Sequence, residues 1–287
     1  MSDILKETEF IMKKYKIKAN KALGQNFLIS DQVINKIVDC SEITKKDLVI
    51  EIGPGLGTLT NELLKKAGKV ICIELDKKMI KILNDRFYLY NNFELINDDV
   101  LKVKLNKIIK EEKEKNKFEQ VKIVANLPYY ITTPIIMKLL EDKLDLNSIT
   151  VMIQKEVADR LIAIPGEKNT GAITYSVYYY ATSEGIMEVP NNSFIPEPEV
   201  TSKVIKLNLR TEPPVEVKSK GVMFEIIKSA FMQRRKTLLN ALTNTKVFMS
   251  KEEGIQILKE VGLEENIRAE KLTLKDFANI TNKILAD

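Results

Sequence analysis

Short apolar runs alternate with amphipathic segments along the first half of the chain. Five runs have the length and composition of buried strands, at 48–52, 69–74, 93–97, 121–125 and 149–153. Apolar residues recur at helical spacing before the first of these runs, at 31–40, and between later ones, at 58–67 and 77–87. A further helix opens at Pro134, with Thr133 as its N-cap. This alternation predicts an α/β fold with a doubly wound sheet, because parallel strands need crossover helices.

The pattern changes after the fifth strand. The segments 186–189 and 200–209 predict a final antiparallel pair, joined by a proline-spaced loop. Pro213-Pro214 marks a domain boundary, and apolar residues recur at helical spacing from Gly221 onward. We therefore expect a Rossmann-like domain at 1–210 and a small helical domain at 211–287.

A glycine-rich turn follows the first strand directly and precedes a helix. Such a turn lets backbone N–H groups approach a bound nucleotide closely. Gly53, Gly55 and Gly57 give the pattern E-x-G-x-G-x-G, typical of S-adenosylmethionine-dependent methyltransferases. The dinucleotide fingerprint G-x-G-x-x-G needs its third glycine where Thr58 stands. NAD or FAD binding and a turn without a ligand are the alternatives.

Acidic residues stand at the ends of the next two strands. Glu74 ends the second strand, roughly twenty residues past the turn, where an acid accepts hydrogen bonds from ribose hydroxyls. The alternative for Glu74 is an acid that favours the start of the following helix. Asp98 and Asp99 follow the third strand. Either can reach a cofactor's adenine amino group, and either can cap the next segment.

The most specific pattern is Asn126-Leu127-Pro128-Tyr129, after the fourth strand. An exocyclic amine is a poor nucleophile because its lone pair is delocalised into the ring. The Asn126 amide oxygen and the Leu127 carbonyl can accept its two hydrogens and aim the lone pair at a methyl group. Pro128 fixes φ, and it has no N–H that would compete with the amine for these acceptors. Tyr129 offers a flat face to an extruded base, a contact worth ~1–3 kcal/mol. An ordinary Asn-Pro-containing turn is the alternative.

Composition limits the chemistry further. The 287 residues contain no histidine, which excludes histidine-based acid–base catalysis, and the two cysteines have no metal-binding spacing. No run is long enough for a transmembrane helix, no signal peptide is expected, and a reducing cytoplasm fits. The net charge is +5, with a lysine-rich stretch at 1–21 and a cluster of Arg234, Arg235 and Lys236 that we expect on a helix. Both basic segments predict phosphate contacts, with a solvated surface as the alternative.

Five segments occur in an order that resembles one enzyme family. They are KALGQNFL, EIGPGLGTLT, NLPYYITTP, SFIPEPEVTSKV and FMQRRKTLLNAL. The chain looks like the ribosomal RNA adenine N6,N6-dimethyltransferases, specifically the bacterial small-subunit (kasugamycin-resistance) branch. This resemblance places cofactor contacts on six residues, Asn26, Leu28, Gly53, Glu74, Asp99 and Asn126. It selects Asp99 over Asp98, and it implies that Phe194 packs near the target base, opposite Tyr129.

The resemblance implies a reaction and its partners. S-adenosyl-L-methionine would donate two methyl groups to N6 of each of two adjacent adenosines, in a hairpin loop near the 3′ end of small-subunit rRNA. The substrate would be this rRNA or an immature small ribosomal subunit, and we expect a monomer without metal. The alternatives are a macrolide-resistance methyltransferase of large-subunit rRNA, an adenine-specific DNA methyltransferase, a binding-only assembly factor and, most remotely, a dehydrogenase.

Overall fold

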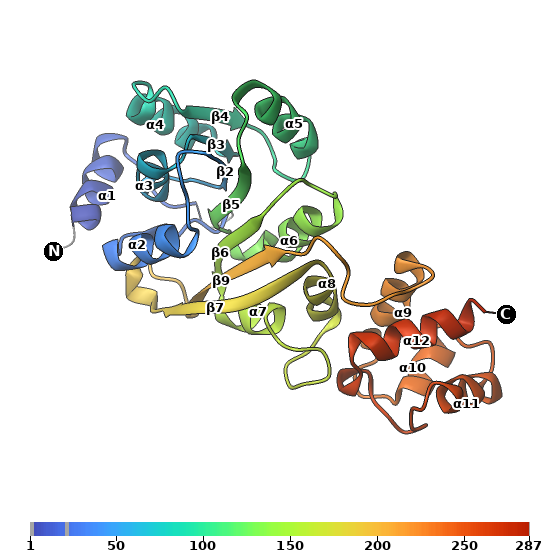
Figure 1. Ribbon diagram of the computed structural model, residues 1–287. Helices are drawn as coiled ribbons and strands as arrows, with labels where there is room; N and C mark the ends of the chain where they lie inside the picture. Colours follow the sequence, from blue (N-terminus) through green and yellow to red (C-terminus); the bar gives the residue numbers. More distant parts are fainter. Residues whose placement is uncertain (1–2, 21–22, 287) are drawn as a thin grey trace. The chain divides into compact units, whose positions relative to one another are not determined.

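The computed structural model describes residues 3–20 and 23–286 (Figure 1). These residues form two compact units. The first contains the residues up to Ala158 together with Glu184–Leu209, and the second contains Asp159–Ser183 and the residues from Arg210 onward. Lys21, which we counted in the basic N-terminal stretch, lies outside the described residues.

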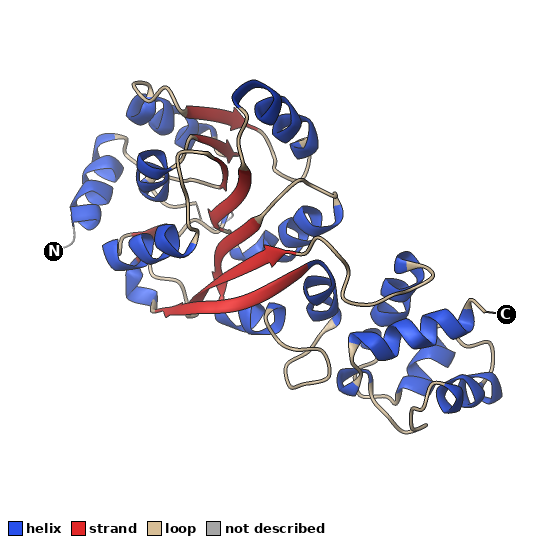
Figure 2. Cartoon of the chain, in the orientation of Figure 1, coloured by secondary structure: helices blue, strands red, loops and turns tan. Residues whose placement is uncertain are grey.

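A seven-stranded sheet forms the centre of the first unit, with strand order β4-β3-β2-β5-β6-β9-β7 in the described chain (Figure 2). Neighbours from β4 to β6 are parallel, and β9 is antiparallel to β6. The order reverses between β2 and β5, so a crevice is expected at the carboxyl ends of these strands. The strand bounds are β2 Asp47–Ile52, β3 Lys69–Glu74, β4 Phe93–Asn97, β5 Gln120–Asn126, β6 Ser148–Gln154, β7 Ala181–Val189 and β9 Ser202–Leu209. The predicted doubly wound α/β fold is confirmed.

Helices surround the sheet, and their bounds are α1 Asp3–Lys14, α2 Asp31–Cys40, α3 Thr58–Lys66, α4 Lys77–Phe87, α5 Leu105–Asn116, α6 Thr132–Glu141 and α7 Lys155–Leu161. Of these, α2, α3, α4 and α6 were predicted from the sequence. Ser30 caps α2, as its side chain accepts a hydrogen bond from the Val33 N–H at 3.4 Å. None of the helices in the described residues has both the length and the apolar character of a membrane span.

The start of α6 differs from the prediction. The helix begins at Thr132, so Thr133 lies inside it and is not its N-cap. The Pro128 carbonyl oxygen accepts hydrogen bonds from the Ile131 N–H at 3.3 Å and from the Thr132 hydroxyl at 3.0 Å. These bonds close a 3₁₀ turn over Tyr129–Ile131 that runs directly into the helix.

The second unit is helical, with α8 at Ala172–Tyr180, α9 at Lys220–Met232, α10 at Leu238–Asn244, α11 at Lys251–Glu260 and α12 at Leu274–Ile284. Tyr175 of α8 is fully buried in its core. Its ring lies 5.1 Å from that of Phe277, and its hydroxyl donates to the Leu272 carbonyl oxygen at 2.7 Å. This packing brings Asp159–Ser183 into the helical unit, whereas we had expected the whole of 1–210 in the first domain.

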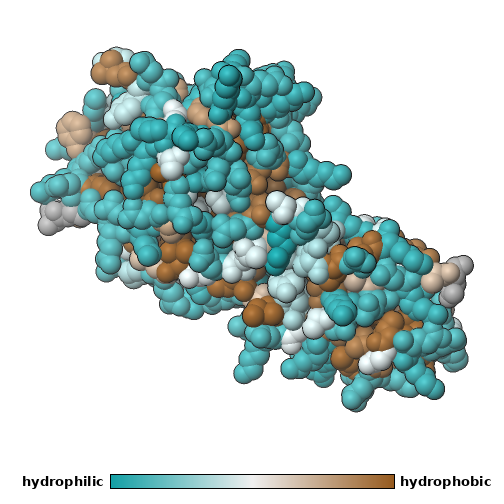
Figure 3. Space-filling view, viewed as in Figure 1, coloured by the Kyte–Doolittle hydropathy of each residue, from teal (hydrophilic) through white to brown (hydrophobic). Residues whose placement is uncertain are grey.

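Over the visible face, hydrophilic residues predominate and hydrophobic residues form separate groups (Figure 3).

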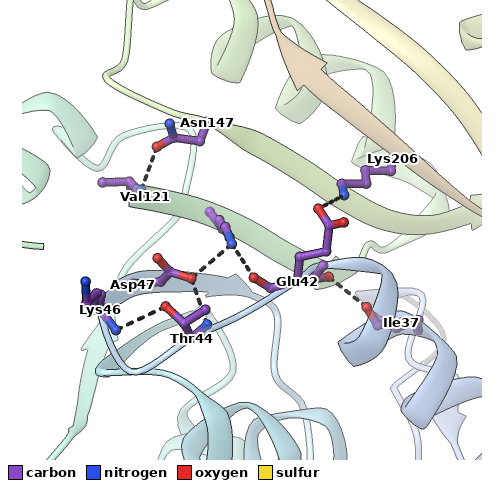
Figure 4. A network of polar contacts seen from close by, with 10 residues as sticks. Ile37, Glu42, Thr44, Lys46, Asp47, Val121, Asn147 and Lys206 are labelled. Atoms are coloured by element: carbon purple, nitrogen blue, oxygen red, sulfur yellow. Dashed lines mark hydrogen bonds and ion pairs between the residues drawn. The ribbon is translucent and has the colours of Figure 1, made fainter. Parts of the chain in front are cut away.

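A buried polar network lies near the amino ends of β2 and β5 (Figure 4). The Lys122 ammonium group donates to the Asp47 carboxylate at 2.9 Å and to the Glu42 carbonyl oxygen at 2.6 Å. Lys206 of β9 pairs with the Glu42 carboxylate at 2.7 Å. Lys122 is 5% exposed and Asp47 is 2% exposed. A buried charge needs a hydrogen-bonded partner, so this network fixes the loop before β2 against the sheet.

Candidate active site

One cavity opens at the carboxyl ends of β2, β3 and β5. All six residues expected to contact the cofactor line it, namely Asn26, Leu28, Gly53, Glu74, Asp99 and Asn126. Leu127, Pro128 and Tyr129 line the same cavity. The structure therefore brings the predicted cofactor and catalytic segments together at the switch point of the sheet.

The glycine-rich turn has a backbone that favours glycine. Gly53, Gly55 and Gly57 have φ values of 66°, 59° and 81°. The Gly57 N–H donates to the Pro54 carbonyl oxygen at 2.9 Å and closes the turn before α3. A side chain at these positions would be strained, since other residues rarely adopt positive φ.

Glu74 is held by backbone donors at the edge of the cavity. Its two carboxylate oxygens accept hydrogen bonds from the Gly55 N–H at 3.1 Å and the Asp76 N–H at 2.8 Å. The side chain is 7% exposed, and this burial raises the pKa of the carboxyl group, while the backbone hydrogen bonds oppose the rise. These bonds fix the orientation of the carboxylate, whose oxygens have further acceptor sites.

Glu51 is a cavity residue that we did not select from the sequence. It is 1% exposed in the middle of the sheet and lines the same cavity. The Thr60 hydroxyl donates to its carboxyl group at 2.6 Å, and the Cys72 thiol lies at 3.4 Å. Burial raises the pKa of Glu51 to about 7. A single acid inside an otherwise apolar strand was the signal in the sequence that pointed to it.

The two aspartates after β4 both line the cavity. Asp99 is half-buried, and its carboxylate accepts a hydrogen bond from the Leu101 N–H at 3.0 Å. Asp98 is exposed, and its carboxylate accepts one from the Asp99 N–H at 2.7 Å. Asp99 thus caps the following turn and also faces the cavity. The choice of Asp99 over Asp98 as the adenine contact stays a prediction.

The loop after β5 presents two unused acceptors. The Asn126 side-chain amide donates to the Asn26 carbonyl oxygen at 3.3 Å, which directs its own oxygen away from that bond. The Leu127 N–H donates to the Met152 carbonyl oxygen at 3.1 Å. Within residues 3–20 and 23–286, no donor bonds to the Asn126 side-chain oxygen or to the Leu127 carbonyl oxygen. By contrast, the Pro128 carbonyl oxygen is already engaged by the turn before α6.

Tyr129 and Tyr130 have different environments. The Tyr129 hydroxyl forms a 2.5 Å hydrogen bond with the Ser202 hydroxyl, and burial raises its pKa. The side chain is half-buried, so part of its ring remains accessible at the cavity. Tyr130 is 58% exposed and has no such anchor among the described residues. Tyr129 is the fixed aromatic face of the loop.

Phe194 is a core residue of the first unit. It is 1% exposed and belongs to the hydrophobic core, and it does not line the cavity. It starts the short strand β8 (Phe194–Ile195), which pairs with β1 (Phe27–Leu28), and Leu28 is its direct partner. We had expected a loop here, whereas Phe194 and Ile195 form a short strand. The expected place of Phe194 near the target base, opposite Tyr129, stays a prediction.

The basic cluster of the second unit also differs from the prediction. Arg234, Arg235 and Lys236 are exposed, but they lie in a turn after α9 and not on a helix. The helix ends at Met232, and the Lys236 N–H donates to the Gln233 carbonyl oxygen at 2.8 Å. Arg234 also donates to the Thr170 carbonyl oxygen at 3.0 Å, which fixes one of the three cations.

The Rossmann-like sheet and the acids around its glycine turn define a methyltransferase. The chain belongs to the ribosomal RNA adenine dimethylase family, whose model matches residues 16–286. Curated relatives named ribosomal RNA small subunit methyltransferase A are similar over nearly their full length. The one from Alkaliphilus metalliredigens is 47% identical, covering 98% of this chain and 96% of its own. The one from Clostridioides difficile is 45% identical, covering 96% of this chain and 94% of its own.

Solved structures have the same fold. A dimethyladenosine transferase from Plasmodium falciparum superimposes with a TM-score of 0.72 at 26% identity, covering 88% of this chain and 95% of that one. The 23S rRNA methyltransferase ErmE gives a TM-score of 0.69 at 22% identity, covering 91% of this chain and 100% of that one. The predicted resemblance to the ribosomal RNA adenine dimethyltransferases is confirmed.

Proposed function

We propose that this protein uses S-adenosyl-L-methionine to dimethylate N6 of two adjacent adenosines in the 3′-terminal hairpin loop of small-subunit (16S) rRNA. The reaction would contribute to small-subunit biogenesis in the cytoplasm. One observation carries the proposal, which is the pair of unused acceptors on Asn126 and Leu127 in the cavity beside the glycine turn. The names of the curated relatives support the small subunit as the target.

The residues around the cavity fit the cofactor. Glu74 keeps acceptor sites for ribose hydroxyls, and the glycine-rich turn has no side chains beyond Cα at Gly53 and Gly55 that would keep a ligand from the backbone. Asp99 would accept from the adenine amino group, and Asn26 and Leu28 close the cavity from the N-terminal side. When bound, the cofactor supplies an electrophilic methyl group.

The chain's own residues account for the activation of the adenine amine. The Asn126 oxygen and the Leu127 carbonyl oxygen accept its two hydrogens, which localises the nitrogen lone pair. Tyr129 stacks on the extruded base and holds it in line for transfer. No imidazole is needed, which agrees with a sequence that has no histidine. Each transfer releases one proton from the nitrogen. The secondary amine left after the first transfer has one hydrogen, which one of the two acceptors holds during the second methylation.

Recognition of the RNA rests on phosphates and shape. Lysines in α1 and the exposed cluster of Arg234, Arg235 and Lys236 are the expected phosphate contacts. An immature small ribosomal subunit is the proposed substrate, and the protein acts as a monomer. The likeness to the 23S rRNA methyltransferase ErmE makes large-subunit rRNA the appropriate comparison substrate.

A methyl-transfer assay tests this function. Small ribosomal subunits that lack the dimethylation and naked large-subunit rRNA are incubated in parallel with labelled S-adenosylmethionine, and primer extension locates the label. We expect label on paired adenosines near the small-subunit 3′ end. Label on large-subunit rRNA alone would contradict the proposal. Cofactor binding without label on either RNA would indicate a binding-only assembly factor.

A matched pair of variants tests the role of Asn126. Asn126→Ala should lower the methylation rate by about 10²–10³-fold, the range for losing one preorganised polar group. Asn106→Ala is the control, because Asn106 is an exposed asparagine of α5 whose side chain bonds only to the Asp142 carbonyl oxygen among the described residues. Equal rates for the two variants would remove Asn126 from the mechanism.

A further inference from the structure

The N-terminal helix α1 is joined to the glycine-rich turn through one side chain of α4. Arg86, in the last turn of α4, donates to the Leu56 carbonyl oxygen through one terminal nitrogen. Its other terminal nitrogen pairs with the Glu7 carboxylate of α1 at 2.6 Å. Leu56 is part of the turn that lines the cavity. A continuous polar chain therefore runs from the surface of α1 to the turn.

The residue after Arg86 contacts the next residue of the same turn. A Cβ added to Gly57 would lie 2.6 Å from the Phe87 ring, so this ring is in close contact with the backbone of the turn. The Arg86 guanidinium in turn lies 5.1 Å from the centre of the Phe87 ring. Consecutive residues of α4 thus hold consecutive residues of the turn, one by a hydrogen bond and one by packing. The shape of the turn depends on how firmly α4 presents these two side chains.

Burial makes the ion pair between Arg86 and Glu7 important. The Arg86 side chain is 11% exposed, whereas that of Glu7 is 43% exposed. In the described part of the chain, Glu7 is the one carboxylate that pairs with this guanidinium. A buried cation without a counter-charge is drawn toward water, and a guanidinium holds two partners at once through its rigid fork. Removal of the Glu7 charge should therefore loosen the bond between Arg86 and Leu56.

Further contacts keep α1 in place on α4. Ile11 is 4% exposed and belongs to the core of the first unit. The Tyr15 hydroxyl, just after α1, donates to the Asp85 carboxylate at 3.1 Å. The Tyr15 hydrogen bond ties the end of this segment to α4, and Ile11 anchors α1 in the core of the first unit, both independently of Glu7. A variant at Glu7 can therefore change the polar chain while the helix stays docked.

We propose that Glu7 and Arg86 are positioning residues for the cofactor, and that α1 belongs to the cofactor site although none of its residues lines the cavity. This inference rests on the proposed function, since it takes the cavity to bind S-adenosylmethionine. Through the Leu56 carbonyl, the two side chains hold the turn with the backbone of Gly53 and Gly55 facing the cavity. Cofactor affinity then depends on a helix that lies outside the cavity.

The test measures binding of S-adenosylhomocysteine by isothermal titration calorimetry, which needs no turnover. Arg86→Lys keeps the charge but lacks the two terminal nitrogens that reach Leu56 and Glu7 separately. We expect its dissociation constant to rise at least tenfold, as expected for a lost charge-assisted hydrogen bond. Glu7→Gln should raise it about three- to tenfold. Glu9→Gln is the matched control, because Glu9 is exposed on the same helix and makes no ion pair within the described residues. Its constant should equal that of the wild type.

Two readouts separate positioning from a general loss of stability. Binding is measured far below each variant's melting temperature, and steady-state kinetics follow on small ribosomal subunits. Positioning predicts a higher KM for S-adenosylmethionine, with kcat and the KM for the RNA substrate unchanged. A lower melting temperature with unchanged binding in Glu7→Gln and Arg86→Lys would overturn this inference and leave the proposed function intact. Failure of the wild type to bind S-adenosylhomocysteine would overturn the proposed function and this inference with it.

Discussion

Glu51 should make the stability of the protein fall as the pH rises from about 4.5 to about 7. Its pKa is about 7 in the folded chain, against an ordinary value of 4.5. Between these pH values the folded state holds a proton that the unfolded state has lost, so the free energy of unfolding decreases as pH rises. At about 1.4 kcal/mol for each pH unit, the whole interval corresponds to about 3 kcal/mol. The effect is complete above pH 7 and absent below pH 4.5.

Glu51→Gln removes this dependence and keeps an oxygen to accept the Thr60 hydroxyl. Urea unfolding of the cofactor-free protein at pH 5 and pH 8 gives the free energy of unfolding of both proteins. Between these pH values the wild type should lose more of its free energy of unfolding than the variant, by about 2.5 kcal/mol. The other titrating groups are common to both proteins and cancel in the comparison. Parallel pH profiles for the two proteins would refute the reasoning.

Three further substitutions test other parts of the account. Asp47→Asn leaves the Lys122 ammonium buried without its counter-charge. The free energy of unfolding, measured by urea titration, should fall by about 3–5 kcal/mol. A loss below about 1 kcal/mol would contradict this expectation. Gly57→Ala places a Cβ 2.6 Å from Phe87 at a φ of 81°. The free energy of unfolding should therefore fall by about 2 kcal/mol or more. An unchanged melting temperature would contradict the close contact between Phe87 and the turn. Tyr129→Ala should slow methylation about 5- to 150-fold through lost stacking, while Tyr129→Phe should retain most activity; equal losses would assign the role to the hydroxyl.

Features that depend on neighbouring residues were predictable from the sequence. The strands, the helices around them and the glycine turn follow from apolar periodicity and from residues with special backbone preferences. The end of each strand also fixed where Glu74 and Asn126 would meet, because parallel strands share one carboxyl edge. Those two residues do line one cavity.

Features set by distant contacts were not predictable. Tyr175 assigns its segment to the helical unit through Phe277 and Leu272, which lie about one hundred residues further along the chain. Nothing in the sequence around Phe194 shows that it is buried in the core and that its strand pairs with β1. The bond from Arg86 to the Leu56 carbonyl oxygen likewise joins a side chain to a backbone atom thirty residues away. Such contacts leave no periodic pattern in the sequence around the residues that make them.

The most direct test of the proposed activity is the amount of N6,N6-dimethyladenosine formed on each substrate particle. Small ribosomal subunits that lack the modification are incubated to completion with the protein and S-adenosylmethionine, and the nucleosides of their rRNA are quantified by mass spectrometry. The proposal predicts two N6,N6-dimethyladenosines for each subunit. In the time that the wild type needs to reach completion, Asn126→Ala should form no more than a small fraction of this amount, because its rate is about 10²–10³-fold lower. Absence of the dimethylated nucleoside with the wild-type protein would contradict the account.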